Sequence, residues 1–211
     1  MLGVAASRKT GWRLAVRTDE ELIAEILGGQ TASFSELAGR HRSYVERLCQ
    51  RFFSDPEIAR DLAQECFIRA YTALASYRRE MPFTGWLRAI ATNLCYDELR
   101  RRRRRPEELI ADFTAPEVQW MHLVNDATPE EIVAAAEEMR EAHDVAHCLL
   151  DTLKPEDRTV LILKDSEGLN VSEIAGIMGW SEAKVKIRAF RARQALRKYA
   201  ERLRSAERSD R

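Results

Sequence analysis

The stretch that decides the fold runs from Val171 to Gln194 and reads VSEIAGIMGWSEAKVKIRAFRARQ. Its first part places apolar residues at i, i+3, i+4 and i+7: Val171, Ile174, Ala175 and Met178. This spacing predicts a short amphipathic helix. Gly179-Trp180-Ser181 predicts a tight turn, with Ser181 as the N-cap of a second helix. Two helices joined by a short turn that contains glycine, the second of them basic, predict a helix-turn-helix.

The second helix of this motif has two different faces. Helical spacing turns Val185, Ala189, Ala192 and Leu196 inward. The opposite face carries Ala183, Ile187, Phe190, Arg191 and Gln194. Cations cluster along the helix at Lys184, Lys186, Arg188, Arg191 and Arg193. Such cations can neutralise phosphates while side chains near the helix start reach base edges, so we favour DNA binding. The alternative is a basic surface helix within a bundle.

Upstream of this motif the start and stop signals predict a series of helices, and no segment shows the alternation typical of a strand. Helix starts are indicated by capping boxes at Thr18–Glu21 and Ser33–Glu36, by Asp55-Pro56, and by Thr84 as a single cap. The last of these helices is expected to run into six arginines, Arg100–Arg105, and to end at Pro106. Residues 19–105 are therefore predicted to form one four-helix domain.

The charge of the chain is unevenly distributed, although it carries 34 basic and 34 acidic residues in total. Residues 106–128 hold five acids and no basic residue, which predicts a flexible acidic linker. Thr128-Pro129-Glu130-Glu131 then predicts a new helix start. The remaining segments are expected to be a disordered basic extension at 1–18, a second helical domain at 129–203 and a tail at 204–211.

No apolar run approaches the roughly 20 residues of a membrane-spanning helix, and the N-terminus lacks the apolar core of a secretory signal. The four cysteines, Cys49, Cys66, Cys95 and Cys148, have no CxxC spacing. We therefore expect buried free thiols in a protein of the reducing cytosol, with no membrane insertion.

Two sets of motifs stand in a fixed order along the chain. The first reads DPEIARDLAQECF at 55–67 and FTGWLRAIATNLCYD at 83–97. The second begins with LKPEDRTVL at 153–161 and continues through Glu167-Gly-Leu to the helix-turn-helix. Together they resemble the extracytoplasmic-function (ECF) group of bacterial sigma factors. The resemblance implies an all-α fold of two small helical domains, the first for polymerase and the proximal promoter element, the second for the distal element.

The resemblance also implies roles for individual residues. Asp61, Gln64 and Glu65 match positions that grip the clamp helices of the polymerase, and all three lie off the apolar stripe of their predicted helix. The positions that match the proximal promoter element are Arg78, Arg79, Trp86, Asn93, Tyr96 and Arg100. Those that match the distal element are Lys184, Lys186, Ile187, Phe190 and Arg191. Other interpretations remain: a merely solvated face for the first set, and a core position for Trp86.

A different class of site is suggested by His143, His147 and Cys148. Two imidazoles at i, i+4 on a helix have the spacing that binds zinc. No further ligand follows from the spacing, and His143 falls on an apolar helix face. We therefore predict that His143 is a core-edge residue and that the chain binds no metal and no other cofactor.

The sequence thus predicts an ECF-type sigma factor that binds core RNA polymerase, recognises and helps open specific promoters, and has no catalysis of its own. Its expected partners are core polymerase, promoter DNA in double-stranded and melted form, and an anti-sigma factor. It would be cytoplasmic, either free or held at the membrane by that factor. The alternative is a helix-turn-helix regulator that is not a polymerase subunit and uses its first domain for dimerisation or sensing.

Overall fold

The computed structural model of this chain describes residues 17–104, 144 and 146–209. These residues form helices joined by short loops, and no strand occurs among them. The predicted all-α fold is therefore confirmed. Of the helices in this part, none combines the length and apolar character needed to cross a membrane.

The acidic linker at 106–128 and most of the basic extension at 1–18 lie outside the described residues. The chain contacts divide the molecule into two compact units, Met1–Arg40 and His41–Arg211.

In the first unit, α1 (Asp19–Leu27) begins at its predicted capping box. The Thr18 hydroxyl accepts a hydrogen bond from the Glu21 backbone N–H at 3.2 Å. The Glu21 carboxylate in turn accepts one from the Thr18 N–H at 2.6 Å. The helix then buries Leu22, Ile23 and Ile26. The prediction of this helix start is confirmed.

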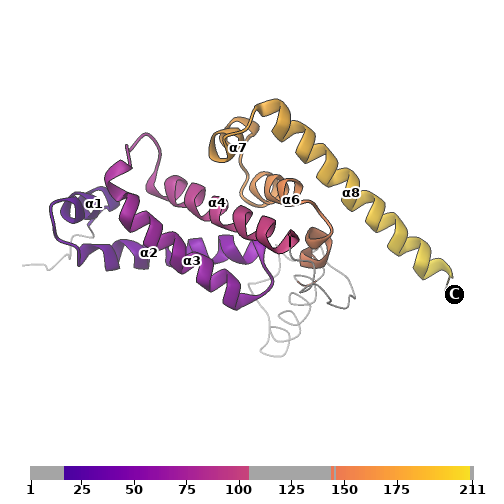
Figure 1. Ribbon diagram of the computed structural model, residues 1–211, viewed down its shortest axis with the longest axis horizontal. Helices are drawn as coiled ribbons and strands as arrows, with labels where there is room; N and C mark the ends of the chain where they lie inside the picture. Colours follow the sequence, from indigo (N-terminus) through magenta and orange to yellow (C-terminus); the bar gives the residue numbers. More distant parts are fainter. Residues whose placement is uncertain (1–16, 105–143, 145, 210–211) are drawn as a thin grey trace, which may run out of the picture. The chain divides into compact units, whose positions relative to one another are not determined.

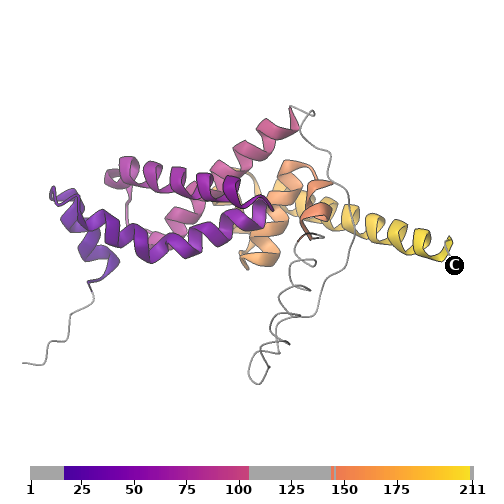
Figure 2. The same ribbon diagram turned by 90° about the horizontal axis from the view of Figure 1, so that it is seen from below.

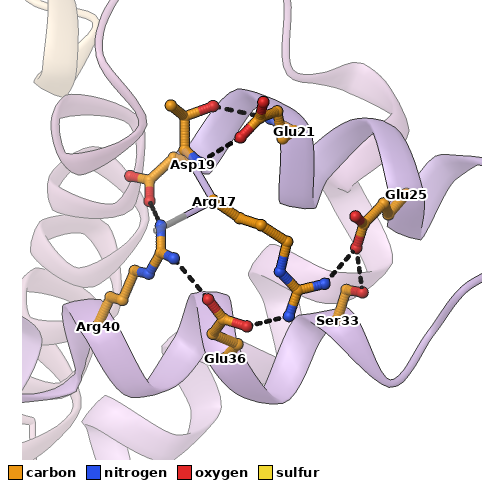
Figure 3. A network of polar contacts seen from close by, with 8 residues as sticks. Arg17, Asp19, Glu21, Glu25, Ser33, Glu36 and Arg40 are labelled. Atoms are coloured by element: carbon orange, nitrogen blue, oxygen red, sulfur yellow. Dashed lines mark hydrogen bonds and ion pairs between the residues drawn. The ribbon is translucent and has the colours of Figure 1, made fainter. Parts of the chain in front are cut away.

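The second capping box, between Ser33 and Glu36, is not present. Ser33 is the first residue inside α2 (Ser33–Phe52), and its hydroxyl donates to the Glu25 carboxylate at 2.5 Å. The Glu36 carboxylate instead accepts hydrogen bonds from Arg17 and Arg40, as Figure 3 shows. Both side chains of the expected box are therefore engaged with other partners.

In the second unit, α3 (Pro56–Ala73) and α4 (Phe83–Arg103) pack side by side (Figures 1 and 2). A short 3-10 turn, η1 (Leu74–Ser76), follows α3. The buried face of α3 carries small side chains: Ala59, Ala63, Cys66 and Ala70. Small side chains let α4 approach closely, and the Cys66 thiol donates to the Leu87 carbonyl of α4 at 3.7 Å.

The starts of these two helices differ. Asp55 caps α3 as predicted, because its carboxylate accepts from the Glu57 N–H at 2.9 Å while Pro56 occupies the first helical position. Thr84 does not cap α4: the helix begins at Phe83 and has no side-chain cap. Its first backbone bonds go to the carbonyl of Pro82, which accepts from Gly85 N–H at 2.8 Å. The predicted Thr84 cap is therefore wrong: the N-cap position is Pro82, two residues earlier.

The C-terminal part of this unit carries the predicted helix-turn-helix. A helix α6 (Pro155–Leu161) continues into a π-helical segment, η3 (Ile162–Ser166). It packs against α8 (Glu182–Ser209), as does α7 (Val171–Met178), and Figure 1 shows α8 running on beyond both. The core of this motif consists of Val160, Leu163, Leu169, Ile174, Ala175, Val185 and Ala189.

The turn of the motif is fixed at both of its ends. Gly179 ends α7 with φ 62°, a left-handed conformation that glycine adopts without a steric cost. The Ser181 hydroxyl accepts from the Lys184 N–H at 3.3 Å, which confirms Ser181 as the cap of α8. A capping box between Asn170 and Glu173, which sequence reasoning missed, starts α7.

Candidate nucleic-acid interface

The inward face of α8 is the one that the sequence predicts. Val185 and Ala192 are fully buried and Ala189 nearly so. Two cations of this helix form ion pairs with neighbouring elements. Arg188 donates to Asp157 of α6 at 3.2 Å, and Arg193 donates to Asp165 of η3 at 2.7 Å. These two arginines therefore brace α8, and the predicted cation cluster divides into bracing and outward-facing members.

The outward face of α8 combines cations with large apolar side chains. Ile187 is 51% exposed and Phe190 is 67% exposed. The Lys184 ammonium lies 3.9 Å from the centroid of the Trp180 ring, which fixes this cation beside the turn. Lys186 makes an exposed ion pair with Glu182 at 3.7 Å. All the positions predicted for the distal element thus lie on the solvent side of one helix, Arg191 included.

On α4, the structure brings together two of the residues predicted for the proximal element. The Arg100 guanidinium lies over the Tyr96 ring, 5.6 Å from its centroid. Asn93 is exposed one turn away. The Tyr96 ring also meets Trp180 edge-on, with centroids 5.8 Å apart, and its hydroxyl lies 3.5 Å from a Glu156 carboxylate oxygen. Burial, followed by the charge of Glu156, raises the pKa of the Tyr96 hydroxyl.

Trp86 belongs to a separate aromatic cluster on the same helix. Its ring lies 5.3 Å from that of Tyr77 and 5.6 Å from that of Phe83, measured between centroids. Because the side chain is half-buried, it contributes to packing and also presents an edge to solvent. Trp86 is thus partly a packing residue, and its role in promoter binding stays a prediction.

The loop that precedes α4 has an unusual backbone. Arg79 has φ 57°, in the left-handed region that side-chain-bearing residues seldom adopt. The Tyr77 hydroxyl donates to the Met81 carbonyl at 2.7 Å and closes the loop. Arg78 and Arg79 are both exposed at its tip. A strained loop that projects two guanidinium groups is typical of a functional segment.

The face of α3 that points away from α4 is polar at its start and apolar at its end. Asp61 and Gln64 are exposed, as predicted, and Glu65 is partly exposed and pairs with Arg69 at 2.8 Å. Further along, Ile68 is 53% exposed and Tyr71 is 42% exposed. Sequence reasoning missed these two apolar residues, although their helical spacing from Asp61 and Gln64 could have indicated them.

The arginine run at the end of α4 is only partly available to DNA. Arg101 and Arg102 both donate to Glu98, at 2.7 Å and 2.8 Å. These bonds, opposed by burial, lower the pKa of the Glu98 carboxyl. Arg103 reaches the Leu153 carbonyl at 3.5 Å, whereas Arg104 is exposed.

A buried carboxylate that sequence reasoning did not single out is Glu167, which follows η3. Its side chain is 5% exposed and accepts a hydrogen bond from the Tyr44 hydroxyl at 2.9 Å. Arg51 forms an ion pair with it, and Arg88 lies 3.9 Å away. These partners come from α2 and α4, more than 75 residues upstream, so local sequence patterns could not reveal them.

The candidate metal ligands do not form a site in the described residues. His147 is buried and its Nδ1 atom lies 3.3 Å from the guanidinium of buried Arg158, whereas His143 lies outside the described part. The Cys148 thiol is half-exposed. Within the described residues there is no group of three or more His, Cys, Asp or Glu side chains that could hold a metal ion.

Comparisons with known proteins agree with this geometry. Residues 37–105 match the model of sigma-70 region 2, and residues 143–196 match that of sigma-70 region 4. The three surfaces described above, on α3, α4 and α8, thus lie on the domains of a sigma-70-type initiation factor. The chain is 34% identical to the ECF RNA polymerase sigma-E factor of Haemophilus influenzae, over 85% of this chain and 93% of the relative. It is 32% identical to the RNA polymerase sigma-H factor of Pseudomonas aeruginosa, over 88% and 95%.

The chain belongs to the ECF sigma factors, which confirms the family inferred from the motifs. Solved structures share its fold at lower identity. CnrH in complex with the cytosolic domain of CnrY matches with a TM-score of 0.55 and 22% identity, over 87% of this chain and 97% of that one. The sigma factor RpoE of Bartonella quintana, in complex with the anti-sigma factor NepR, matches with a TM-score of 0.54 and 19% identity, over 80% and 96%.

Proposed function

We propose that this ECF sigma factor uses three surfaces. The first, called here the α3 face, consists of Asp61, Gln64 and Glu65 and binds the core polymerase. The second, the α4 surface, binds the opened proximal promoter element through Arg78, Arg79, Trp86, Asn93, Tyr96 and Arg100. The third, the α8 face, binds the distal element through Lys184, Lys186, Ile187, Phe190 and Arg191. The polymerase supplies the chemistry, and the chain has no catalysis of its own.

The observation that carries this proposal is the division of α8 into a braced side and an open side. Arg188 is held by Asp157 at 3.2 Å, while Ile187 and Phe190 point outward at 51% and 67% exposure. A helix fixed along one side and open on the other can enter the major groove with its N-terminal half as a rigid body. Outward cations then meet phosphates and the intervening side chains meet base edges.

The α4 surface has the chemistry that single-strand capture needs. Tyr96 supplies a π-face and Arg100, stacked on it, supplies positive charge beside it. The exposed arginines Arg78 and Arg79 extend the charge to the neighbouring loop. This combination favours an unpaired base and its phosphate over a duplex.

The proposed domains are residues 19–105 and 129–203, separated by an acidic linker at 106–128. We place the protein in the cytoplasm, where it is either free or held at the membrane by an anti-sigma factor. Support for such a partner comes from the similar CnrH and RpoE folds, which were solved with the cytosolic domain of CnrY and with an anti-sigma factor.

Assembly with core polymerase tests this function most simply. The full chain is mixed with core polymerase and separated by gel filtration, and the complex is then given a pool of genomic promoter fragments. The proposal expects co-elution and specific transcripts that need both components. The alternative regulator would bind its DNA sites equally well without polymerase and would yield no such transcripts.

A further inference from the structure

The α8 face has an apolar centre. Ile187 and Phe190 are 51% and 67% exposed, and they lie three residues apart, so that they are neighbours on the helix surface. Ala183 lies one turn before Ile187 and is also exposed. The middle of the α8 face therefore offers methyl, methylene and aromatic groups.

The cations of α8 frame this apolar centre. Lys184 is fixed against Trp180 at 3.9 Å, and Lys186 and Arg191 are exposed. Arg188 and Arg193 are committed to Asp157 and Asp165 on the braced side of the helix. In the first turns of α8, the cations not engaged in these two pairs, Lys184, Lys186 and Arg191, thus lie beside Ile187 and Phe190. Such a frame is complementary to the phosphates on either side of a DNA groove, which argues for DNA as the occupant of this face.

The edges of the bases in the major groove offer one group that an apolar side chain recognises. Adenine, guanine and cytosine present hydrogen-bond donors and acceptors there, whereas thymine adds its C5 methyl. We infer that Ile187, supported by Phe190, reads the C5 methyl of a thymine in the distal promoter element. This inference rests on the proposed function and adds to it the chemical group that the α8 face selects.

The expected effect follows from the burial of one methyl group. Replacing the contacted thymine by 2′-deoxyuridine removes the methyl and leaves every hydrogen-bonding group of the base unchanged. The burial of a methyl-sized group corresponds to about a three- to fivefold change in affinity. Ile187→Ala removes the contact from the other side, so the two losses should not add.

The experiment uses holoenzyme assembled from the full chain and core polymerase. Selection from a random duplex pool first defines the distal element. Each thymine in the element is then replaced in turn by 2′-deoxyuridine, and the two duplexes compete for one holoenzyme preparation. Wild type is compared with Ile187→Ala and with Leu27→Ala, since Leu27 is 53% exposed on α1 and belongs to none of the proposed surfaces.

The inference expects one thymine at which removal of the methyl lowers the affinity of wild type and of Leu27→Ala about three- to fivefold. The affinity of Ile187→Ala should hardly change at this position. An equal loss in wild type and in Ile187→Ala would overturn it, because the methyl is then read elsewhere or through DNA shape. The inference would also be overturned if no thymine of the distal element were sensitive to loss of its methyl. The apolar centre of the α8 face would then be assigned to contact with an apolar protein surface. Failure of the proposed function is seen earlier and separately, because the selection then enriches no distal element.

Discussion

Arg188 of α8 donates to the Asp157 carboxylate of α6 at 3.2 Å, and both side chains are largely buried, at 20% and 9% exposure. The bond joins residues that are 31 positions apart and, together with the buried Val185, Ala189 and Ala192, fixes the rotation of α8 about its own axis. That rotation decides which side chains face outward. The orientation of the whole α8 face therefore depends in part on an ion pair on the side of the helix that faces α6.

The first prediction concerns this pair. Asp157→Ala leaves the Arg188 guanidinium partly buried without its carboxylate, which should lower the free energy of unfolding by about 1–3 kcal/mol. Urea denaturation of the full chain, followed by circular dichroism, measures the change. The matched control is Asp165→Ala, which breaks the more exposed pair with Arg193 (53% and 43% exposed). An exposed pair contributes at most about 1 kcal/mol, so equal losses in the two variants would contradict the bracing role.

The second prediction concerns the α3 face. Gln64→Arg places a cation on the proposed polymerase surface and should abolish co-elution with core polymerase, because like or misplaced charge in an interface is costly. Gln64 is exposed, so stability should change by less than about 0.5 kcal/mol. Gln50→Arg on α2 is the control, since Gln50 is also exposed and lies on none of the proposed surfaces. Full assembly of Gln64→Arg would show that the α3 face binds something else.

The third prediction concerns promoter opening. Tyr96→Ala removes a stacking platform that is worth about 1–3 kcal/mol per base, whereas Tyr96→Phe keeps the ring. Holoenzyme with the alanine variant should bind promoter duplex yet open it poorly, and the phenylalanine variant should open it normally. Permanganate reactivity of unpaired thymines reports the opening. If the phenylalanine variant is as impaired as the alanine variant, the hydroxyl matters and stacking is not the role.

The fourth prediction concerns the thiols. Burial raises the pKa of Cys66 to about 12, so its reactive thiolate form is almost absent at pH 8. Burial also raises the pKa of Cys148, but this thiol is half-exposed. Iodoacetamide at pH 8 should therefore modify Cys148 first in the native chain, with Cys49, Cys66 and Cys95 reacting only after denaturation. Mass spectrometry of the peptides reads the order, and early modification of Cys66 would mean that its helix pair opens in the native state.

Local patterns in the sequence predicted most of the helices and the outward side chains correctly. The spacing of Val185, Ala189 and Ala192 determines which side of α8 is buried, so Ile187 and Phe190 could be placed outward without a structure. The helix starts at Thr18, Asp55 and Ser181 were predicted correctly, because each capping bond joins neighbours in the chain. Thr84 failed as a cap because α4 begins before it, at Phe83.

The prediction failed where distant residues compete for the same group. Ser33 and Glu36 have the pattern of a capping box, but Glu25, Arg17 and Arg40 bind them instead. Ion pairs such as Arg188–Asp157, and the Glu167 carboxylate with Tyr44, join positions that no local spacing connects. The site residues themselves followed from a family resemblance, and their roles remain predictions that the variants above test.

The central claim is that this chain directs core polymerase to promoters through the α8 face, and run-off transcription tests it most directly. Purified core polymerase is supplied with wild type, Lys186→Ala or Arg191→Ala on a promoter obtained by selection. The account predicts specific transcripts with wild type and none with core polymerase alone. Each variant should bind the promoter more weakly and yield fewer transcripts. A lost base contact should cost about 1–3 kcal/mol of binding free energy, whereas a lost phosphate contact should make binding less dependent on salt. Co-elution with polymerase should stay unchanged in both variants. The central claim would be contradicted if both variants gave as much specific transcript as wild type across a range of salt concentrations.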